Sequence, residues 1–374
     1  MNGLLGGVVL LAVVTQVTPV TIANAREAPG CDPDIVLLPM LEGHVSSVVY
    51  AMNDQGWAVG TSRAPTRDGA FIRYSKAVLW RDGDVIDLGI GGRLTHEERV
   101  VSVAVDVNEA GVVAAQWRRY VESDWVGASS WLWDDGTATR LEVGGQRPFA
   151  VVRSLNDHGV AVGYVSDFPT PGSARPAVWR DGQQIRLPVP PGARGVAFRV
   201  NNSDLVVGWT QFPRSERRRW YWQLGGTNGP LPDPDGYQQF LIDLDNHDRI
   251  LASAKSPESG LRGYLWDGPQ SLPQLVGNHA FAKAWDMDDD GDLTGYRGGF
   301  LGVGNRAWVS HLGAETVTEL PSPKGRGNKS AMGLSVIRGV TWFAPQGGIS
   351  VAGVSGGEWT DGGLATIWTC TQGY

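Results

Sequence analysis

The chain has 374 residues, of which 42% are hydrophobic and 19% are charged, so it can bury a core and is not a disordered chain. Its net charge of −7 argues against a protein whose whole surface binds nucleic acid, although a local basic patch is compatible with it. Two cysteines and six histidines exclude iron–sulfur clusters and multi-zinc sites, while 51 glycines and 16 tryptophans indicate many turns and a repeated aromatic position.

The N-terminal segment has the features of an export signal. Residues 1–25 carry no charged side chain, Leu4–Val14 is an apolar run, and Ala23–Ala25 is a small-x-small cleavage motif. We therefore expect a secreted protein whose mature chain is 26–374. Cys31 lies in a poor context for lipid attachment, which makes lipid anchoring the weaker alternative. No later segment approaches 18 apolar residues, so we expect no membrane span.

The remaining chain repeats one unit seven times. Its first motif is a short apolar run, Asn or Asp, two polar residues and Gly. It occurs at Met52–Gly56, Val107–Gly111, Leu155–Gly159, Val200–Asp204, Leu244–Asp248 and Met287–Gly291, with a degenerate copy at Phe343–Gly347. Its second motif places one tryptophan in each unit, at Trp80, Trp133, Trp179, Trp222, Trp266, Trp308 and Trp368.

Each unit is typical of four antiparallel strands. In the first unit we expect Ser46–Met52, Trp57–Gly60, Lys76–Trp80 and Val85–Leu88 as the first to fourth strands, because apolar alternation is interrupted by Asn/Asp-Gly turns. Such units predict an all-β, seven-bladed β-propeller of four-stranded blades. The repeated tryptophan is expected between blades. The expected blades are 44–98, 99–146, 147–192, 193–236, 237–278, 279–327 and 328–374 plus 31–43.

The last unit lacks a fourth strand. The segment Asp34–Gly43 resembles the fourth strands of other units, so we expect the N-terminal strand to complete the last blade and close the ring. Cys31 and Cys370 flank this closure, and an exported protein can keep a disulfide there; two free thiols are the alternative.

These motifs resemble the HAF-repeat family of bacterial extracellular proteins. The matching residues are Met52–Gly60 with Ala77–Gly83, and Leu155–Gly163 with Ala177–Gly182. The family's His-Ala-Phe before the tryptophan is replaced here by Ala-Val-Leu at 77–79. The resemblance implies a secreted propeller and carries over no catalytic residue.

One acidic turn matches part of a calcium-binding loop. Asp286, Asp288, Asp290 and Asp292 alternate around Gly291, as hard oxygen ligands do in calcium loops. Position twelve of such a loop would be Arg297 rather than Glu, so the alternative is an ordinary turn between the first and second strands. We expect no cofactor, with calcium as the one open possibility.

The connections between second and third strands are the expected binding surface. They are long and varied, as binding loops on rigid scaffolds are. The candidate ligand-binding residues are Arg73, Trp117, Tyr120, Trp125, Arg217, Arg218, Arg219 and Arg297. Loops 61–76, 116–129, 164–176, 209–219, 252–263, 296–306 and 355–364 carry a net charge of +7, whereas six first turns carry −9. Propeller topology places the two sets at opposite ends.

The sequence therefore predicts a secreted, monomeric binding module for an extracellular glycan, an anionic polymer or a protein, without specific nucleic-acid binding. The alternative is a propeller glycoside hydrolase or lyase that uses loop carboxylates such as Glu122, Asp124 and Glu358. The string Gly353-x-Ser355-x-Gly357 matches a nucleophile elbow but lacks the strand–turn–helix context that this motif requires.

Overall fold

The computed structural model describes most of the repeated region. It describes residues 33–65, 74–91, 98–121, 124–144, 148–167, 173–215, 217–232, 238–256, 260–276, 284–297, 306–314, 316–321, 331–338, 348–355 and 363–370. The export signal, the seventh first turn and Cys31 lie outside these ranges. Regular structure in the described ranges is entirely β-strand. None of the described residues forms a helix long and apolar enough to cross a membrane.

Antiparallel strands follow one another in the order expected for the repeat. They are β1 (Asp34–Leu37), β2 (Ser46–Met52), β3 (Ala58–Ala64), β4 (Tyr74–Arg81), β5 (Asp84–Asp87), β6 (Glu98–Val107), β7 (Val113–Val121), β8 (Asp124–Asp134), β9 (Thr137–Arg140), β10 (Pro148–Leu155), β11 (Ala161–Asp167), β12 (Arg175–Arg180), β13 (Gln183–Arg186), β14 (Arg194–Val200), β15 (Leu205–Gln211), β16 (Arg218–Gln223), β17 (Asn228–Pro230), β18 (Gln238–Leu244), β19 (Arg249–Ser256), β20 (Gly260–Asp267), β21 (Gln274–Val276), β22 (Ala284–Met287), β23 (Asp292–Arg297), β24 (Arg306–His311), β25 (Thr318–Glu319), β26 (Ala331–Arg338), β27 (Ile349–Ser355) and β28 (Leu364–Cys370).

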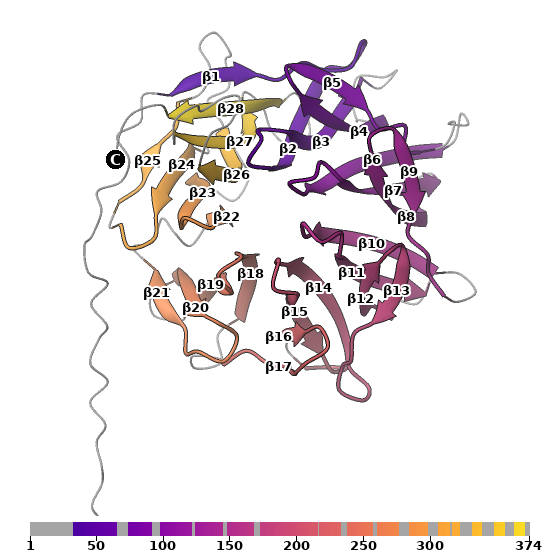
Figure 1. Cartoon of the computed structure of the whole chain (residues 1–374), viewed down its shortest axis with the longest axis vertical. Coiled ribbons are helices and arrows are strands. Elements are labelled where there is room, and N and C mark those ends of the chain that lie inside the picture. The colour runs from indigo at the N-terminus through magenta and orange to yellow at the C-terminus, as the bar shows by residue number, and fades with distance from the viewer. Residues whose placement is uncertain are drawn as a thin grey trace, which may run out of the picture.

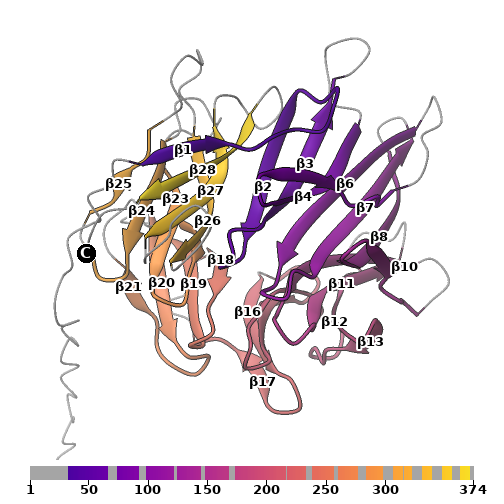
Figure 2. The same cartoon turned by 45° about the horizontal axis from the view of Figure 1, so that its top comes forward.

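The strands form sheets that stand around a common centre (Figure 1). The four-stranded sheets are β10–β13, β14–β17, β18–β21, β22–β25 and β26–β28 with β1. Strands β2–β9 form one eight-stranded sheet, in which β4 and β6 meet only through two parallel residue pairs. The first strand of each unit lies nearest the centre, and the tilted view shows the sheets side by side (Figures 1 and 2).

The N-terminal strand β1 pairs with the C-terminal strand β28, as the sequence predicts. Ile35 lies opposite Trp368, and the Leu38 N–H donates to the Ala365 carbonyl. The corresponding leucines after other fourth strands, such as Leu187, make the same backbone hydrogen bond. Strand β1 therefore occupies the position of a fourth strand. Cys370 ends β28 and is buried, but Cys31 lies outside the described residues, so the disulfide stays a prediction.

The repeated tryptophans are buried, which confirms the packing position inferred for them. Trp80, Trp133, Trp179, Trp222, Trp266, Trp308 and Trp368 are each at most 5% exposed. Five indole N–H groups also donate to a backbone carbonyl that follows the preceding fourth strand: Trp80 to Pro39, Trp179 to Glu142, Trp222 to Pro188, Trp266 to Pro232 and Trp368 to Pro321. Each such indole joins two consecutive units, because it packs in one and bonds to the other.

Every described first strand contains one β-bulge at the same place. The register skips Tyr50, Val105, Arg153, Phe198, Ile242, Trp285 and Leu334. The bulge brings the first-strand backbone against the second strand, where a Cβ on Gly60 would lie 1.9 Å from the Val48 carbonyl oxygen. This contact explains the glycine of the Ala-Val-Gly motif. Gly353 takes the same position opposite the last bulge, so the nucleophile-elbow string is part of an ordinary second strand.

Second and third strands extend further than the sequence predicts. The expected loop 116–129 is mostly a hairpin, since β7 continues to Val121 and β8 begins at Asp124. The expected loop 252–263 is likewise shortened by β19 and β20. Trp117, Tyr120 and other large side chains favour continued cross-strand pairing, which the loop prediction did not take into account.

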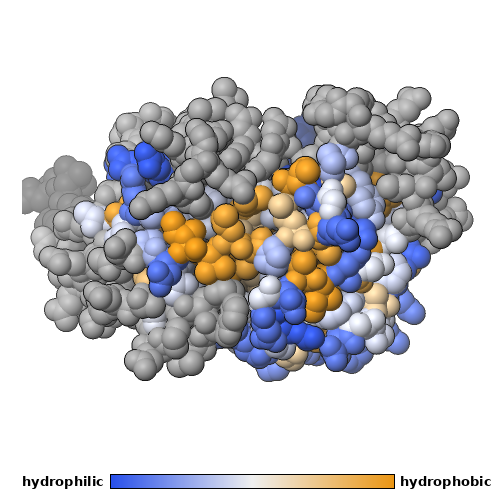
Figure 3. All heavy atoms as spheres, turned by 90° about the horizontal axis from the view of Figure 1, so that it is seen from above, coloured by the Kyte–Doolittle hydropathy of each residue, from blue (hydrophilic) through white to orange (hydrophobic). Residues whose placement is uncertain are grey.

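The outer edge of β1 carries apolar surface. Val36 and Leu37 are exposed, whereas inner strands such as β28 are buried throughout. Figure 3 views the molecule from this side and shows apolar residues gathered between polar ones.

Candidate functional site in the central channel

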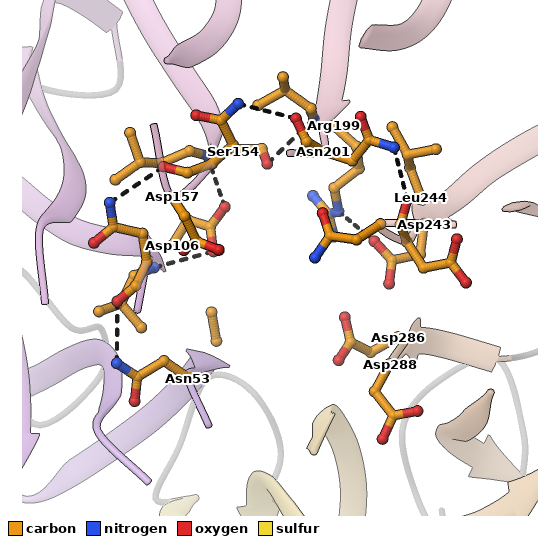
Figure 4. A pocket seen from close by; sticks show the side chains of 18 of the residues that line it. Asn53, Asp106, Ser154, Asp157, Arg199, Asn201, Asp243, Leu244, Asp286 and Asp288 are labelled. Atoms are coloured by element: carbon orange, nitrogen blue, oxygen red, sulfur yellow. Dashed lines mark hydrogen bonds and ion pairs between the residues drawn. The ribbon is translucent and has the colours of Figure 1, made fainter. Parts of the chain in front are cut away.

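The antiparallel strands give the molecule two distinct ends. Turns between first and second strands gather at one end, which we call the turn end; connections between second and third strands lie at the other, the loop end. A pocket of about 390 Å³ opens at the turn end and is lined by turns and first strands from six consecutive units. Labelled side chains around it include Asn53, Asp106, Ser154, Asp157, Arg199, Asn201, Asp243, Leu244, Asp286 and Asp288 (Figure 4).

The repeated asparagine of the first motif links each turn to the next. Its Oδ1 accepts the backbone N–H four residues later, and its Nδ2 donates to the backbone carbonyl of the equivalent residue in the following unit. The donor–acceptor pairs are Asn53 to Asn108 (3.0 Å), Asn108 to Asn156 (3.2 Å), Asn156 to Asn201 (2.9 Å) and Asn201 to Asp245 (2.8 Å). These asparagines are buried, so the motif serves the joints between units rather than a ligand.

The residue after each asparagine repeats this linkage closer to solvent. Its backbone N–H donates to the side chain of the equivalent residue in the next unit: Asp54 to Glu109, Glu109 to Asp157, Asp157 to Asn202, Asn202 to Asn246 and Asn246 to Asp289. An acceptor oxygen is needed at each place, which explains why Asp, Glu and Asn recur there. The acidic turn end is thus largely a structural belt.

Asp245 replaces the linking asparagine and cannot donate a hydrogen bond. Arg249 forms an ion pair with Asp245, and its Nη2 donates to the Asp289 carbonyl at 2.9 Å. The arginine therefore supplies the donor that Asn supplies elsewhere.

The residues that follow the bulges line the pocket floor. Asp106 Oδ2 accepts the Leu155 N–H (2.8 Å), and Asp243 Oδ2 accepts the Met287 N–H (2.8 Å), each from the next unit. Arg199 Nε donates to Asp243 Oδ1 at 2.8 Å. A buried ion pair therefore joins the sheet β14–β17 to the next sheet, β18–β21, in the channel wall.

Burial and crowding alter the titration of the turn-end carboxyl groups. Burial raises the pKa of Asp106 to about 6, against the opposing effect of Arg199. Burial, with the nearby Asp54, Asp157 and Asp289 carboxylates, raises the pKa of Glu109 to about 7, although the hydrogen bond from Asp54 opposes this. Burial likewise raises the pKa of Asp54. The belt therefore includes carboxyl groups that take up protons near neutral pH.

The four aspartates of the suspected calcium loop do not converge. Asp288 Oδ1 caps its own turn by accepting the Asp292 N–H, and Asp292 is fully buried against His311 Nδ1 at 2.9 Å. Asp286 lines the channel, whereas Asp290 is exposed. No three metal-ligating side chains group together within the described part of the chain. The described structure does not gather these four aspartates as one set of metal ligands: they belong to the linking turn of the sixth unit, whose strands point alternate residues in different directions.

The arginine cluster at the loop end divides into two kinds of side chain. Arg217 and Arg218 are exposed, and the Arg217 guanidinium lies 4.5 Å from the Trp209 ring centre. Arg219 is only 6% exposed and stacks on Trp266 at 4.8 Å. Strand alternation along β16 turns Arg219 toward the neighbouring sheet, so it is removed from the predicted ligand-binding set.

The other predicted binding residues are spread around the loop end. Trp117 is half-buried and packs with the core around Trp133, whereas Tyr120 is half-buried on the β7–β8 hairpin. Arg297 is exposed and lies 3.8 Å from Glu319. Arg73 lies outside the described residues, and Trp125 is described only as a strand residue opposite Tyr120.

The described part of the structure does not place the three carboxylates suggested for catalysis relative to one another. Glu122 and Glu358 lie outside the described residues, and Asp124 is known only as the first residue of β8. The sequence analysis did not single out Arg153 or Arg199. Arginine occupies each of these two places in one unit only, so no repeat pattern marks either residue. The shared bulge position is visible only in the strand register.

Comparisons with known proteins identify the type of fold. No family profile and no curated protein sequence matches the chain. Among solved structures, a prolyl endopeptidase is similar at a TM-score of 0.53 and 10% identity over 88% of this chain. TolB from Acinetobacter baumannii gives 0.49 and 11% over 74%, and the β-propeller domain of the trilobed protease from Pyrococcus furiosus gives 0.39 and 7% over 73% of this chain and 97% of its own. The chain spans 51% of the endopeptidase and 65% of TolB. At such low identity these similarities concern the fold alone: the chain is an all-β protein of the β-propeller type.

Proposed function

We propose that this chain is an exported, seven-bladed β-propeller that binds an anionic extracellular polymer through its loop end. In this proposal β1 completes the last blade, a Cys31–Cys370 disulfide secures the closure, and the repeats belong to the HAF-repeat type.

The bonds around β1 support the closed ring. Trp80 donates to the Pro39 carbonyl after β1 in the same way that Trp222 donates to the Pro188 carbonyl after β13. The first and last sheets therefore meet through the contact that joins consecutive units elsewhere. A closed ring gives each blade a neighbour on both faces, and only the short fourth strands keep an outer edge.

The observation that carries the binding proposal is the separation of charge between the two ends. Acidic residues recur in the turns of the turn end. At the loop end, basic residues lie at or near the ends of most second strands and the starts of most third strands, alongside Asp124 and Asp167. The described basic residues there include Arg63, Arg118, Arg119, Arg175, Arg214, Arg217, Arg218, Arg262, Arg297 and Arg306. A field of this sign attracts an anionic chain despite the net charge of −7.

The test is retention of residues 26–374 on immobilised polygalacturonate. Wild-type protein should be retained at low salt and released as salt rises, because exposed charges are screened beyond about 10 Å at 0.1 M. The double variant Arg217→Ala/Arg218→Ala should elute at lower salt. The control, Arg81→Ala/Arg180→Ala, removes the same charge from the turn end, where Arg180 pairs with Asp204, and should elute with the wild type.

Three results would count against this proposal. Wild-type protein that passes through the resin unretained removes the anionic polymer as the partner. Unchanged elution of the Arg217→Ala/Arg218→Ala variant removes that pair from the binding surface. An equal decrease in the eluting salt concentration for the Arg81→Ala/Arg180→Ala control would show that binding does not depend on the loop end.

A further inference from the structure

The bulges recur at one level of the first strands, which lie nearest the central opening (Figure 1). A side chain exposed in the middle of such a strand should be directed toward that opening, because the sheet packs against neighbours on both faces. Trp285 is 38% exposed although Ala284 and Met287 beside it are buried. Tyr50 lines the channel pocket itself. We call the bulge residues Tyr50, Arg153, Phe198 and Trp285, together with Tyr164 and Tyr296 of the second strands, the axial collar.

Arg153 is the cationic member of this collar. Its Nε is buried and has no hydrogen-bond acceptor among the described residues. The groups that act on its guanidinium are Tyr164, through a side-chain hydrogen bond, and two arginines, and they include no carboxylate. Its guanidinium lies 6.0 Å from the Tyr164 ring centre and 5.6 Å from the Phe198 ring centre. Two aromatic rings therefore hold in place a guanidinium that lacks a carboxylate partner.

The electrostatic surroundings of Arg153 add to its need for an anion. Burial lowers the pKa of Arg153, and the nearby Arg118 and Arg199 guanidinium groups lower it further, whereas Tyr164 opposes them. Arg118 Nε and Nη2 donate to Gln116 Oε1 at 3.1 and 2.8 Å. Burying an arginine without a carboxylate partner is costly, and an anionic ligand would offset that cost.

The strand register shows at which end of the channel the Arg153 guanidinium lies. Tyr164 lies opposite Val151, which is further from the turn end than the bulge. Arg118 lies opposite Val101, again on the loop-end side of its bulge. Arg153 therefore reaches toward the basic loop end and away from the acidic belt.

Further aromatic rings of the collar come from the first and sixth units. Trp285 and Tyr296 have ring centres 6.3 Å apart, tilted by 50°, and Tyr296 packs in one cluster with Tyr50. Such rings offer flat apolar faces to a sugar ring, while a guanidinium suits a carboxylate or sulfate.

We infer that the axial collar formed by Arg153, Tyr164, Phe198, Trp285, Tyr296 and Tyr50 binds one acidic sugar residue at the end of a polysaccharide chain. Arg153 takes the anionic group and the aromatic residues take the sugar ring. This inference rests on the proposed function, since the loop-end arginines would attract the remainder of the polymer.

The test is calorimetric titration of residues 26–374 with trigalacturonate, its methyl ester and a sulfated galactan oligosaccharide. Trigalacturonate or the sulfated oligosaccharide should bind, which assigns carboxylate or sulfate as the anion, and the uncharged ester should bind at least about tenfold more weakly. Arg153→Met should weaken binding of the acidic probe by at least about tenfold, because it removes the charge-assisted hydrogen bonds. Arg186→Met is the matched control, since Arg186 is exposed on the outer strand β13 of the same unit and is not part of the loop-end basic surface.

Thermal unfolding separates recognition from a structural role. Without ligand, Arg153→Met should melt at or above the wild-type temperature, because it removes a buried charge that lacks a carboxylate partner. If it does not fold, Trp285→Leu provides the second variant, since the exposed indole should be dispensable for folding but needed for binding. Wild-type affinity in either variant, or equal affinity for the ester, would overturn the inference. Retention on the polygalacturonate resin without oligosaccharide binding would overturn the collar and leave the loop-end proposal standing.

Discussion

At the residue scale, the repeated asparagine is a connector between units. Asn156 is buried, bonds its own turn through Oδ1, and donates through Nδ2 to the Asn201 carbonyl. The sequence predicts the turns well because Asn and Gly have clear turn preferences. It could not predict the bond to the next unit, since that partner lies 45 residues away. Repetition of one Asn per unit was the only available signal.

Asn156→Asp should therefore destabilise the protein although it preserves shape and the Oδ1 acceptor. It removes the donor to Asn201 and places a carboxylate beside the Asp204 side chain. We expect a loss of about 1–3 kcal/mol in the free energy of unfolding, measured by urea denaturation. Gln183→Ala, at an exposed strand position, is the control. Equal stability of the two variants would contradict the connector role.

Glu109 predicts a pH dependence of stability. Its pKa is raised from 4.5 to about 7 on folding, so the folded state binds this proton more tightly than the unfolded chain. Stability from this group is present below about 4.5 and is lost as pH rises through about 7. Glu109→Gln should therefore reduce the fall in melting temperature between pH 5 and 7.5. The change should be partial, because Asp106, with a pKa of about 6, contributes in the same direction. Glu142→Gln, an exposed control, should keep the wild-type slope; an unchanged slope in Glu109→Gln would refute the prediction.

At the element scale, the sequence predicts inner strands better than their connections. The expected strand Ser46–Met52 has the same limits as β2. Its residues are mostly buried and apolar, and the turn signal that follows Met52 marks its end. The expected strand Trp57–Gly60 instead runs as Ala58–Ala64, since polar residues such as Arg63 still pair with the neighbouring strand. The bulges could not be predicted, because no residue type marks the extra residue of a bulge. The glycine that ends the Ala-Val-Gly motif was an indirect signal, since it lies opposite the bulge.

The tryptophan position gives a direct test of packing between sheets. Trp222 is 1% exposed, packs with Val206 and Ala197, and donates to Pro188. Trp222→Ala should lower the free energy of unfolding by about 3–5 kcal/mol in urea denaturation. Trp209→Ala, on a half-exposed indole, should cost clearly less. Similar losses in both would contradict the packing role of Trp222.

The closing strand gives a second test at this scale. Since β1 pairs with β28 and Cys370 ends β28, we expect exported protein to hold Cys31 and Cys370 in a disulfide. Peptide mapping without reductant should recover the two cysteines as one cross-linked pair. Recovery of both as free thiols would refute the disulfide and leave the strand pairing unaffected.

At the scale of the whole molecule, charge divides along the channel axis. The acidic belt is explained by the hydrogen bonds that join the units, so its charge follows from the repeat. The loop-end arginines have no such shared role, which is why we assign recognition to that end. The sequence predicts the separation, because alternation of turns and loops fixes which residues share an end. It does not predict the collar, since Arg153 and Trp285 come from units 3 and 6, which are far apart in the sequence.

The most direct test of recognition at the loop end is hydroxyl-radical footprinting with and without a saturating acidic oligosaccharide. Bound ligand should protect Tyr164, Phe198 and Trp285 in the collar and Trp209 at the loop end. His158 and His247, exposed in the turns of the opposite end, should be oxidised equally in both states. Protection of those histidines with unchanged oxidation of the collar would place the ligand at the turn end and contradict the proposed mode of binding.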